Sequence, residues 1–169
     1  MKFVLASLED LDQIKEMYTK IVQNMYSNDI KIWNEHYPNE LFETDILNKS
    51  LYLLKDNNII IGAFTIYKHD NLEEDLMWTN NSSKAFLLNR LGINVDYLHK
   101  GYGQKLIKYA CKIAKENSAE YLHLLVSDKN IPALSLYEKC NFNKVNGIHE
   151  EKISDDFSIY EYGFEMYLM

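Results

Sequence analysis

The stretch DYLHKGYGQKL, residues 96–106, places two of the chain's six glycines two residues apart at the start of a helical pattern. The apolar segment AFLLNRLGINV (85–95), typical of a strand, precedes it, and apolar residues at helical spacing follow. A strand, a glycine turn and a helix in this order can bind a pyrophosphate, because the first N–H groups of the helix and its dipole favour an anion. The spacing is neither the dinucleotide-binding G-x-G-x-x-G pattern nor a Walker loop. Taken alone, the glycine pair is equally consistent with a structural turn.

A second segment, NIPALSLYEKCNF at 130–142, narrows the choice, because it carries Asn130, Ala133 and Tyr137 in the pattern N-x-x-A-x-x-x-Y. The segments LGINVDYLHKGYGQKLI (91–107) and LLVSDKNIPALSLYEKCNF (124–142) together resemble the two best-marked segments of the GCN5-related N-acetyltransferase (GNAT) superfamily, in their order and separation. The resemblance implies an acetyl-CoA-dependent enzyme that transfers an acetyl group directly to a primary amine.

The rest of the pattern predicts one mixed α/β domain over residues 1–169, a GNAT-like fold with a central sheet of about six to seven strands and about four helices. The strand-helix-strand unit over 86–127 requires parallel neighbours, so the sheet should be mixed. We expect helices after Ser7, after Pro38, from Gly103 to Asn117 and from Ile131 to Lys139. We expect strands over 51–55, 59–67, 85–95, 121–127, about 142–149 and 158–168.

Composition excludes several classes of protein. The net charge is −7, and Arg90 is the only arginine beside seventeen lysines, so general nucleic-acid binding is not expected. No segment approaches a membrane span and no export peptide is evident, which favours the cytoplasm. Cys111 and Cys140 fit neither a disulfide framework nor a zinc site, and we expect no metal. A homodimer is left open.

The resemblance also implies roles for individual residues. The phosphate turn falls on residues 98–103, where Leu98 replaces the glutamine or arginine of the family. Ile93 would present its main-chain N–H to the thioester oxygen, Val95 would hold the pantetheine arm, and Tyr137 would protonate the departing thiolate. The implied acetyl-CoA contacts are Ile93, Val95, His99, Lys100, Gly101, Tyr102, Gly103, Gln104, Asn130, Ala133 and Tyr137, of which Ile93 and Tyr137 would be catalytic.

The acceptor is less well marked. Leu125 and Ser127 stand where related sequences often have an acid and an aromatic residue, and the sequence does not fix the base. Residues 73–75, all acidic, are candidates, although acids in a loop are more often a solvated edge. Arg90 would orient an acceptor or pair with an acid. Three aromatic residues would wall the acceptor pocket or anchor the core: Trp33, Tyr37 and Trp78.

A small amine is the preferred acceptor, because the segments expected to rim the acceptor side carry acids and aromatic residues that would attract a small cation. Two alternatives stay open. A protein or aminoacyl-tRNA acceptor would keep the enzyme class and change the partner. A non-catalytic acyl-CoA-binding module would be a different class, and the presence of Tyr137 argues for chemistry.

Overall fold

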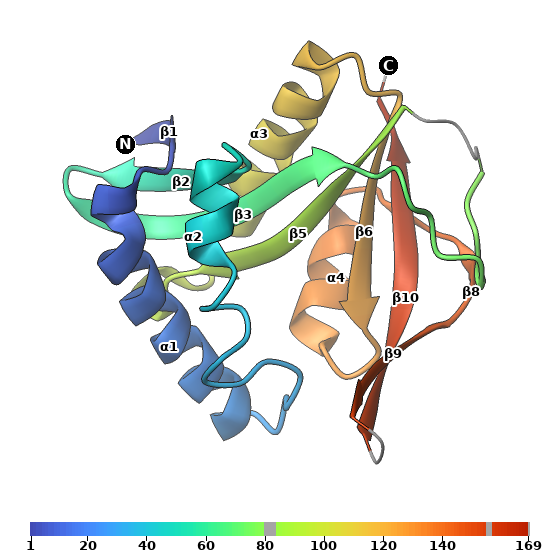
Figure 1. The fold of residues 1–169 in the computed structure, drawn as a ribbon, viewed down its shortest axis with the longest axis horizontal. Coiled ribbons are helices and arrows are strands. Elements are labelled where there is room, and N and C mark those ends of the chain that lie inside the picture. Colours follow the sequence, from blue (N-terminus) through green and yellow to red (C-terminus); the bar gives the residue numbers. More distant parts are fainter. Residues whose placement is uncertain (80–83, 155–156, 169) are drawn as a thin grey trace. The chain divides into compact units, whose positions relative to one another are not determined.

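A computed structural model describes residues 1–79, 84–154 and 157–168 (Figure 1). Its contacts divide the chain into two compact units. Unit 1 comprises Met1–Ile66 and Asn89–Ala110, and unit 2 comprises Tyr67–Leu88 and Cys111–Met169. The strand β5 (Ala85–Ile93) and the helix α3 (Tyr102–Glu116) each have residues in both units.

Unit 1 is built on three antiparallel strands and two helices. Strand β1 (Lys2–Leu5) pairs with β2 (Leu51–Asp56), which forms a hairpin with β3 (Ile59–Lys68). Asn57 takes a positive φ of 52° at the hairpin turn, as its place in the sequence predicts. The helices are α1 (Leu11–Ser27), preceded by a 3-10 turn over Leu8–Asp10, and the short α2 (Phe42–Leu47).

The alternation of side chains along β2 and β3 gives each face of this sheet its own cover. Helices α1 and α2 pack on one face, in a cluster of buried residues that includes Ile14, Met17, Tyr18, Phe42, Leu53 and Ala63. On the other face Tyr109 of α3 stacks on Phe3 at 3.9 Å between ring centroids. The edges of its ring meet Tyr52 and Phe64. The sheet of unit 1 is therefore covered by α1 and α2 on one face and by Tyr109 of α3 on the other.

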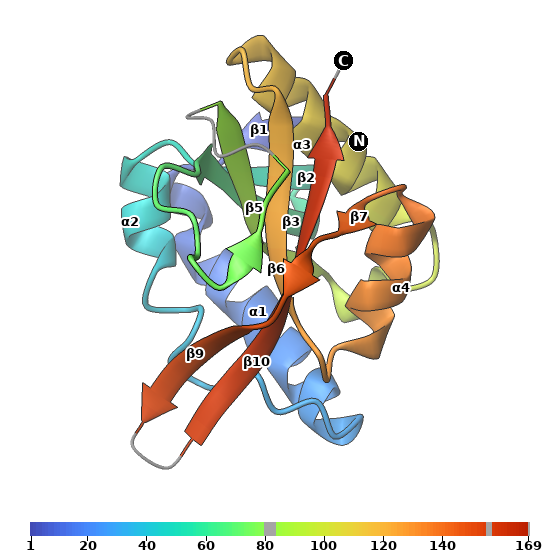
Figure 2. The ribbon, with the colours of Figure 1, turned by 90° about the vertical axis from the view of Figure 1, so that its right-hand side faces the viewer.

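Unit 2 contains the parallel strand pair and most of the C-terminal half. The first three residues of β5, Ala85–Leu87, run parallel to β6 (Tyr121–Ser127), as the strand-helix-strand pattern predicts. Strand β10 (Phe157–Tyr167) is antiparallel to β6 and continues into a hairpin with β9 (His149–Ser154) (Figure 2). Helix α4 (Ile131–Lys139) lies beside β10 and the short β7 (Asn143–Lys144). Two further two-residue strands pair with each other, β4 (Leu76–Met77) and β8 (Asn146–Gly147).

The hydrogen-bonded order of strands is β1-β2-β3-β5-β6-β10-β7, with β9 on β10. The predicted class, a mixed α/β fold with a mixed sheet, is confirmed. The C-terminal part differs in detail, because the strand expected near 142–149 is divided among β7, β8 and the start of β9. Strand β4 was not predicted, because its two residues are too few to show a period in the sequence. None of the helices in the described ranges is long and apolar enough to cross a membrane.

Candidate functional site

The turn between β5 and α3 is fixed at its start by Asn94. Its side-chain amide donates to the main-chain oxygen of Ile60 at 2.9 Å, and its side-chain oxygen accepts from the N–H of Asp96 at 3.2 Å. A 3-10 turn over Val95–Tyr97 follows. His99 and Gly101 then take positive φ values of 59° and 77°, so two residues in the left-handed region precede α3.

The main-chain N–H groups of this turn are open. Among the described residues, none of the N–H groups of residues 99–104 donates a hydrogen bond, and the first bond in this part of the chain runs from Lys105 N–H to the oxygen of Gly101. A Cβ added to Gly101 would meet no atom within 4 Å, so the surface here is clear. Unpaired N–H groups at the start of a 15-residue helix suit an anion, and the turn fits the pyrophosphate of CoA.

Strand β5 is distorted three residues before it ends. Arg90 has a positive φ of 50°, and its carbonyl accepts the hydroxyl of Tyr18 at 2.5 Å. The side chain of Tyr18 fills the space beside Gly92, where an added Cβ would lie 2.9 Å from two ring atoms and from the hydroxyl oxygen. Tyr18 on α1 therefore sets the path of the backbone that leads to Ile93.

The side chain of Arg90 is buried in an ion pair. Its Nε and Nη2 donate to the two oxygens of Asp45 on α2 at 3.0 and 2.8 Å, and the hydroxyl of Thr65 also donates to Asp45 at 3.3 Å. Of the two roles considered for Arg90, the structure shows the pairing with an acid. A second group from the sequence, Trp33 and Tyr37, lies together in unit 1 with ring centroids 6.3 Å apart.

In unit 2, α4 begins and ends as its sequence predicts. The side-chain oxygen of Asn130 accepts from the N–H of Ala133 at 3.3 Å, and Asn141 ends the helix with a φ of 64°. Tyr137 is buried, with ring centroids 5.8 Å from Phe142 and 6.4 Å from Phe164. Its hydroxyl makes no hydrogen bond within the described residues, and burial raises the pKa of Tyr137 well above its ordinary value. The phenol is therefore protonated and available as a donor.

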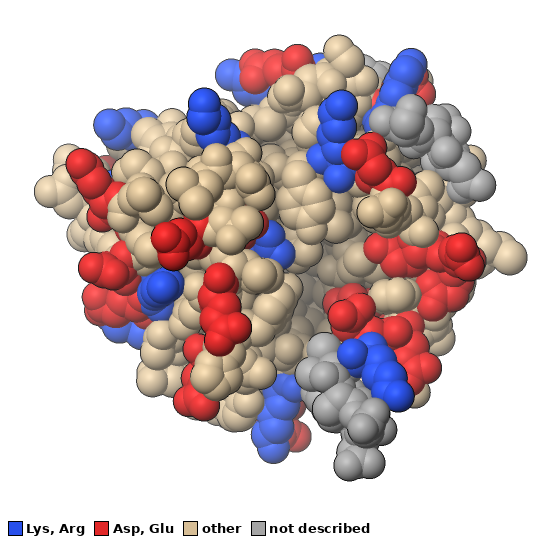
Figure 3. Space-filling model, viewed as in Figure 1, with Lys and Arg blue, Asp and Glu red and all other residues tan. Residues whose placement is uncertain are grey.

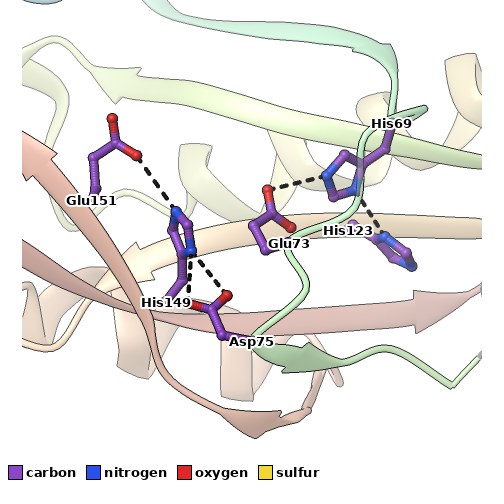
Figure 4. A network of polar contacts seen from close by, with 6 residues as sticks. All are labelled: His69, Glu73, Asp75, His123, His149 and Glu151. Carbon is purple, nitrogen blue, oxygen red and sulfur yellow. Dashed lines mark hydrogen bonds and ion pairs between the residues drawn. The ribbon is translucent and has the colours of Figure 1, made fainter.

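A buried polar chain that the sequence analysis did not identify lies on the other face of the β6–β10 pair (Figure 4). The Nδ1 atoms of His69 and His123 are 3.0 Å apart, and His69 Nε2 is 3.3 Å from Glu73. Trp78 is buried and stacks on His123 at 4.1 Å, so it packs on the sheet. Burial and the nearby His69 lower the pKa of His123 to about 3, and its imidazole is neutral. The one feature of the sequence that indicates this buried polar network is a histidine within the apolar strand YLHLLVS.

A third histidine, His149, contacts Asp75 of the loop before β4 and Glu151 of β9. His149 Nδ1 is 3.0 Å from Asp75, and His149 Nε2 is 3.4 Å from Glu151. Burial lowers the pKa of His149, but the hydrogen bonds with Asp75 and Glu151 and the charges of Asp75 and Glu73 together raise it overall. Figure 3 shows acidic side chains gathered over the region of β8, β9 and β10. Across the described residues, no group of three or more His, Cys, Asp or Glu is arranged to hold a metal ion.

The candidate residues thus fall into two groups by unit. Unit 1 holds the turn over 99–104, the end of β5, and Trp33, Tyr37 and Arg90. Unit 2 holds Asn130, Ala133, Tyr137, Trp78 and the acids of residues 73–75. The turn of unit 1 presents open main-chain N–H groups, and unit 2 holds the protonated phenol of Tyr137.

Comparison with known proteins places these constellations in context. The chain matches the model of the acetyltransferase (GNAT) family over residues 12–142. Among solved structures, one from Staphylococcus aureus Mu50, provisionally named an acetyltransferase, is similar with 26% identity, a TM-score of 0.73 and full coverage of both chains. The yncA protein of Salmonella typhimurium, provisionally named an acetyltransferase and solved with its cofactor acetyl-CoA, has 14% identity and a TM-score of 0.71 over 100% of this chain and 94% of its own.

A ribosomal-protein-alanine N-acetyltransferase from Brucella melitensis has 14% identity and a TM-score of 0.72, with 99% of this chain and 100% of its own covered. These two low identities show a shared fold. The comparison with curated protein sequences finds no significant match.

Proposed function

The chain belongs to the GNAT family of acetyltransferases, which use acetyl-CoA, and from this premise we propose that it transfers the acetyl group to the primary amine of a small cationic molecule. The observation that carries the cofactor part is the run of open N–H groups over residues 99–104 at the start of α3. The acidic surface of unit 2 supports the acceptor part. We take residues 1–169 to act as one N-acetyltransferase domain.

The proposed cofactor contacts lie at the end of β5 and in the residues after it, in the open turn over 99–104, and at the start of α4. The N–H groups of residues 99–104 bind the pyrophosphate. They can do so although Leu98 replaces the glutamine or arginine of the family, because the donors are main-chain groups. Val95 and Asn130 hold the pantetheine arm through polar main-chain and amide groups. Acetyl-CoA supplies an activated thioester, whose oxygen Ile93 N–H stabilises as charge develops on it.

Tyr137 is the proposed proton donor to the departing sulfur. Its raised pKa keeps the phenol protonated, and its hydroxyl has no competing acceptor among the residues that the structure describes. A thiolate is a much stronger base than a neutral thiol, so it can take the proton as the C–S bond breaks. Cys111 is not needed as a nucleophile: its sulfur lies 3.6 Å from Met166 Sδ, and burial raises the pKa of its thiol.

The acceptor is proposed from charge and size. Glu74, Asp75, Glu150 and Glu151 are exposed on unit 2, and Lys152 is the one lysine or arginine of β9. Such a surface attracts a cation and disfavours a polyanion such as tRNA. A protein acceptor with a basic N-terminus would meet the same charges, and it stands as the second candidate because one structure of this fold bears the name of a ribosomal-protein N-acetyltransferase.

The test is thiol release from acetyl-CoA with a panel of acceptors at matched concentration: polyamines, amino sugars, amino acids, basic peptides and aminoacyl-tRNA. We expect the small cationic amines to be the best acceptors, with acetylation of the amine confirmed by mass spectrometry. Their apparent affinity should fall with added salt, since screening weakens attraction to the acidic surface. Efficient transfer to a peptide or to tRNA, with small amines inert, would refute the proposed acceptor. Binding of acetyl-CoA without transfer to any acceptor would favour a binding module.

A further inference from the structure

Glu161 stands at a junction in unit 2. It is the residue of β10 that pairs with both β6 and β9, with Ser127 at the end of β6 and with His149 at the start of β9. Side chains alternate along a strand, so Glu161 lies on the same face of β10 as Gly163 and Glu165. A Cβ on Gly163 would touch Leu76 and Trp78, which shows that this face is the one covered by the segment around β4.

The carboxylate of Glu161 differs from the other acids of this face in having no donor. Glu165 accepts from the N–H and the hydroxyl of Thr79, Glu73 bonds to His69, and Asp75 bonds to His149. No hydrogen bond to Glu161 is made within the described residues, although its side chain is partly buried. A carboxylate that is withdrawn from water without a donor is unstable in its charged form, and it favours a proton or a cationic ligand.

The charges around Glu161 act in the same direction, with one exception. Burial raises the pKa of Glu161 to about 7, with Glu151 on β9 and Glu73 before β4 adding to the rise and His149 opposing it. The residue opposite on β6, Ser127, carries no charge. Glu73 itself is different: burial raises its pKa, but the hydrogen bonds with His69 and with the backbone and the charges of His69 and His149 together outweigh this and lower it overall, so Glu73 stays ionised. Glu161 is therefore the acid of this face that exchanges a proton near neutral pH.

We propose that Glu161 is the base that takes the proton from the acceptor's ammonium group, and that the nearby Glu73 and Glu151 draw this cation in. The inference rests on the proposed function. It supplies the base that the sequence left open, since Leu125 and Ser127 of β6 cannot act as one. The acid comes from the neighbouring strand, opposite Ser127.

Two residues account for the protons of the transfer: Glu161 on one face of β10, and Tyr137 of α4, which packs on the other face. The ammonium loses one proton to Glu161. The free nitrogen then forms the C–N bond while the C–S bond breaks, and it loses its second proton. The sulfur gains a proton from Tyr137, which is refilled by the proton that the nitrogen sheds. The sum is one amide, one thiol and one proton, and Glu161 passes that last proton to solvent. Tyr137 contacts Phe164, whose side chain points to the face opposite Glu161, so the base and the acid serve the two sides of the reaction separately.

The experiment compares Glu161→Gln with Glu150→Gln, an exposed residue of β9 on the opposite face of the β9–β10 hairpin, whose change also removes one carboxylate. With the best amine of the panel, Glu161→Gln should lower kcat/KM by about 10²-fold or more at pH 7.5, as expected for loss of a general base. The rise of kcat/KM with pH through about 7 in the wild type should disappear in this variant. Acetyl-CoA affinity should stay within about twofold, and Glu150→Gln should keep the wild-type pH profile.

A second measurement needs no turnover. Carbon-13 NMR of the glutamate side-chain carboxyls should show one resonance that titrates near pH 7 and is missing in Glu161→Gln. A Glu161 resonance that titrates near 4.5, or a folded Glu161→Gln enzyme with full kcat/KM, overturns the inference. A wild type that acetylates peptides and no small amine refutes the proposed acceptor instead, and the same two readouts, taken with the peptide, still decide the role of Glu161.

Discussion

Replacement of Arg90 by methionine should destabilise unit 1 far more than the loss of a surface ion pair. The guanidinium makes two bonds of 3.0 and 2.8 Å to Asp45, and both side chains are almost fully buried, with 6% and 10% exposed. Arg90→Met leaves the Asp45 carboxylate with the Thr65 hydroxyl as its remaining donor in this cluster. Removal of one partner of a buried pair costs about 3–5 kcal/mol. The positive φ of residue 90 is common to both side chains and does not enter the difference.

A loss of this size is a large share of the ~5–15 kcal/mol that stabilises a typical folded protein. For a chain of this length it corresponds to a melting temperature lower by roughly 6–20 °C. Removal of both charges, in Arg90→Met with Asp45→Leu, should cost less than Arg90→Met alone, because no buried charge is then left without a partner. The sign of this difference separates the desolvation argument from a simple loss of contacts.

Urea unfolding measures both quantities, and the two tryptophans allow it to be followed locally, since Trp33 lies in unit 1 and Trp78 in unit 2. In a Trp78→Phe background the fluorescence of Trp33 reports on the unit that holds Arg90. Glu16→Gln is the control, because it breaks an exposed pair with Lys20 of similar length, 2.8 Å, and should leave the transition unchanged. An Arg90→Met variant within about 1 kcal/mol of the wild type, or a double variant weaker than the single one, would refute the reasoning.

Three further outcomes are expected. Gly101→Val should weaken acetyl-CoA binding, measured by calorimetry, because its side chain would enter the clear space of the turn and a β-branched residue is strained at a φ of 77°; unchanged affinity in a folded variant would contradict the phosphate site. Tyr137→Phe should keep acetyl-CoA binding and lower turnover by about 10²-fold, and full turnover would reduce Tyr137 to packing. In the folded protein the pKa of Glu161 is about 7, whereas its ordinary value is 4.5. As the pH rises from 4.5 to 7, the free energy of unfolding of the wild type should therefore fall by at most about 3 kcal/mol. Urea unfolding of Glu161→Gln should show a smaller fall over the same range.

Local signals made the α4 region and the phosphate turn predictable. Asn130 caps the helix that its position in the sequence indicates, and the bounds Ile131–Lys139 agree with the prediction. The glycine pair likewise lies at the start of α3, because glycine at positive φ and the following helical period are properties of neighbouring residues. The fold class followed from the order of such segments.

The polar networks could not be predicted, because their members are far apart in sequence. His69 and His123 are separated by 54 residues, and Arg90 and Asp45 by 45. Their contacts depend on the path of irregular segments and on strand register, which leave no period. The same holds for Glu161, whose neighbours are set by the register of β10 with β9 and β6. Trp78 shows the converse, since a tryptophan in a polar loop is here buried against the sheet.

Tyr18 and Gly92 are in contact, so the effect of a substitution at one of these positions depends on the residue at the other. The hydroxyl of Tyr18 binds the Arg90 carbonyl, and its ring occupies the space where any side chain at position 92 would stand. In a library that varies both positions at once, larger residues at 92 should survive only beside a much smaller residue at 18. Such pairs would still lack the hydroxyl, so they should fold and yet hold β5 in a different path. Substitutions in this part of the chain therefore preserve the path of β5 only when tyrosine at position 18 still faces glycine at position 92.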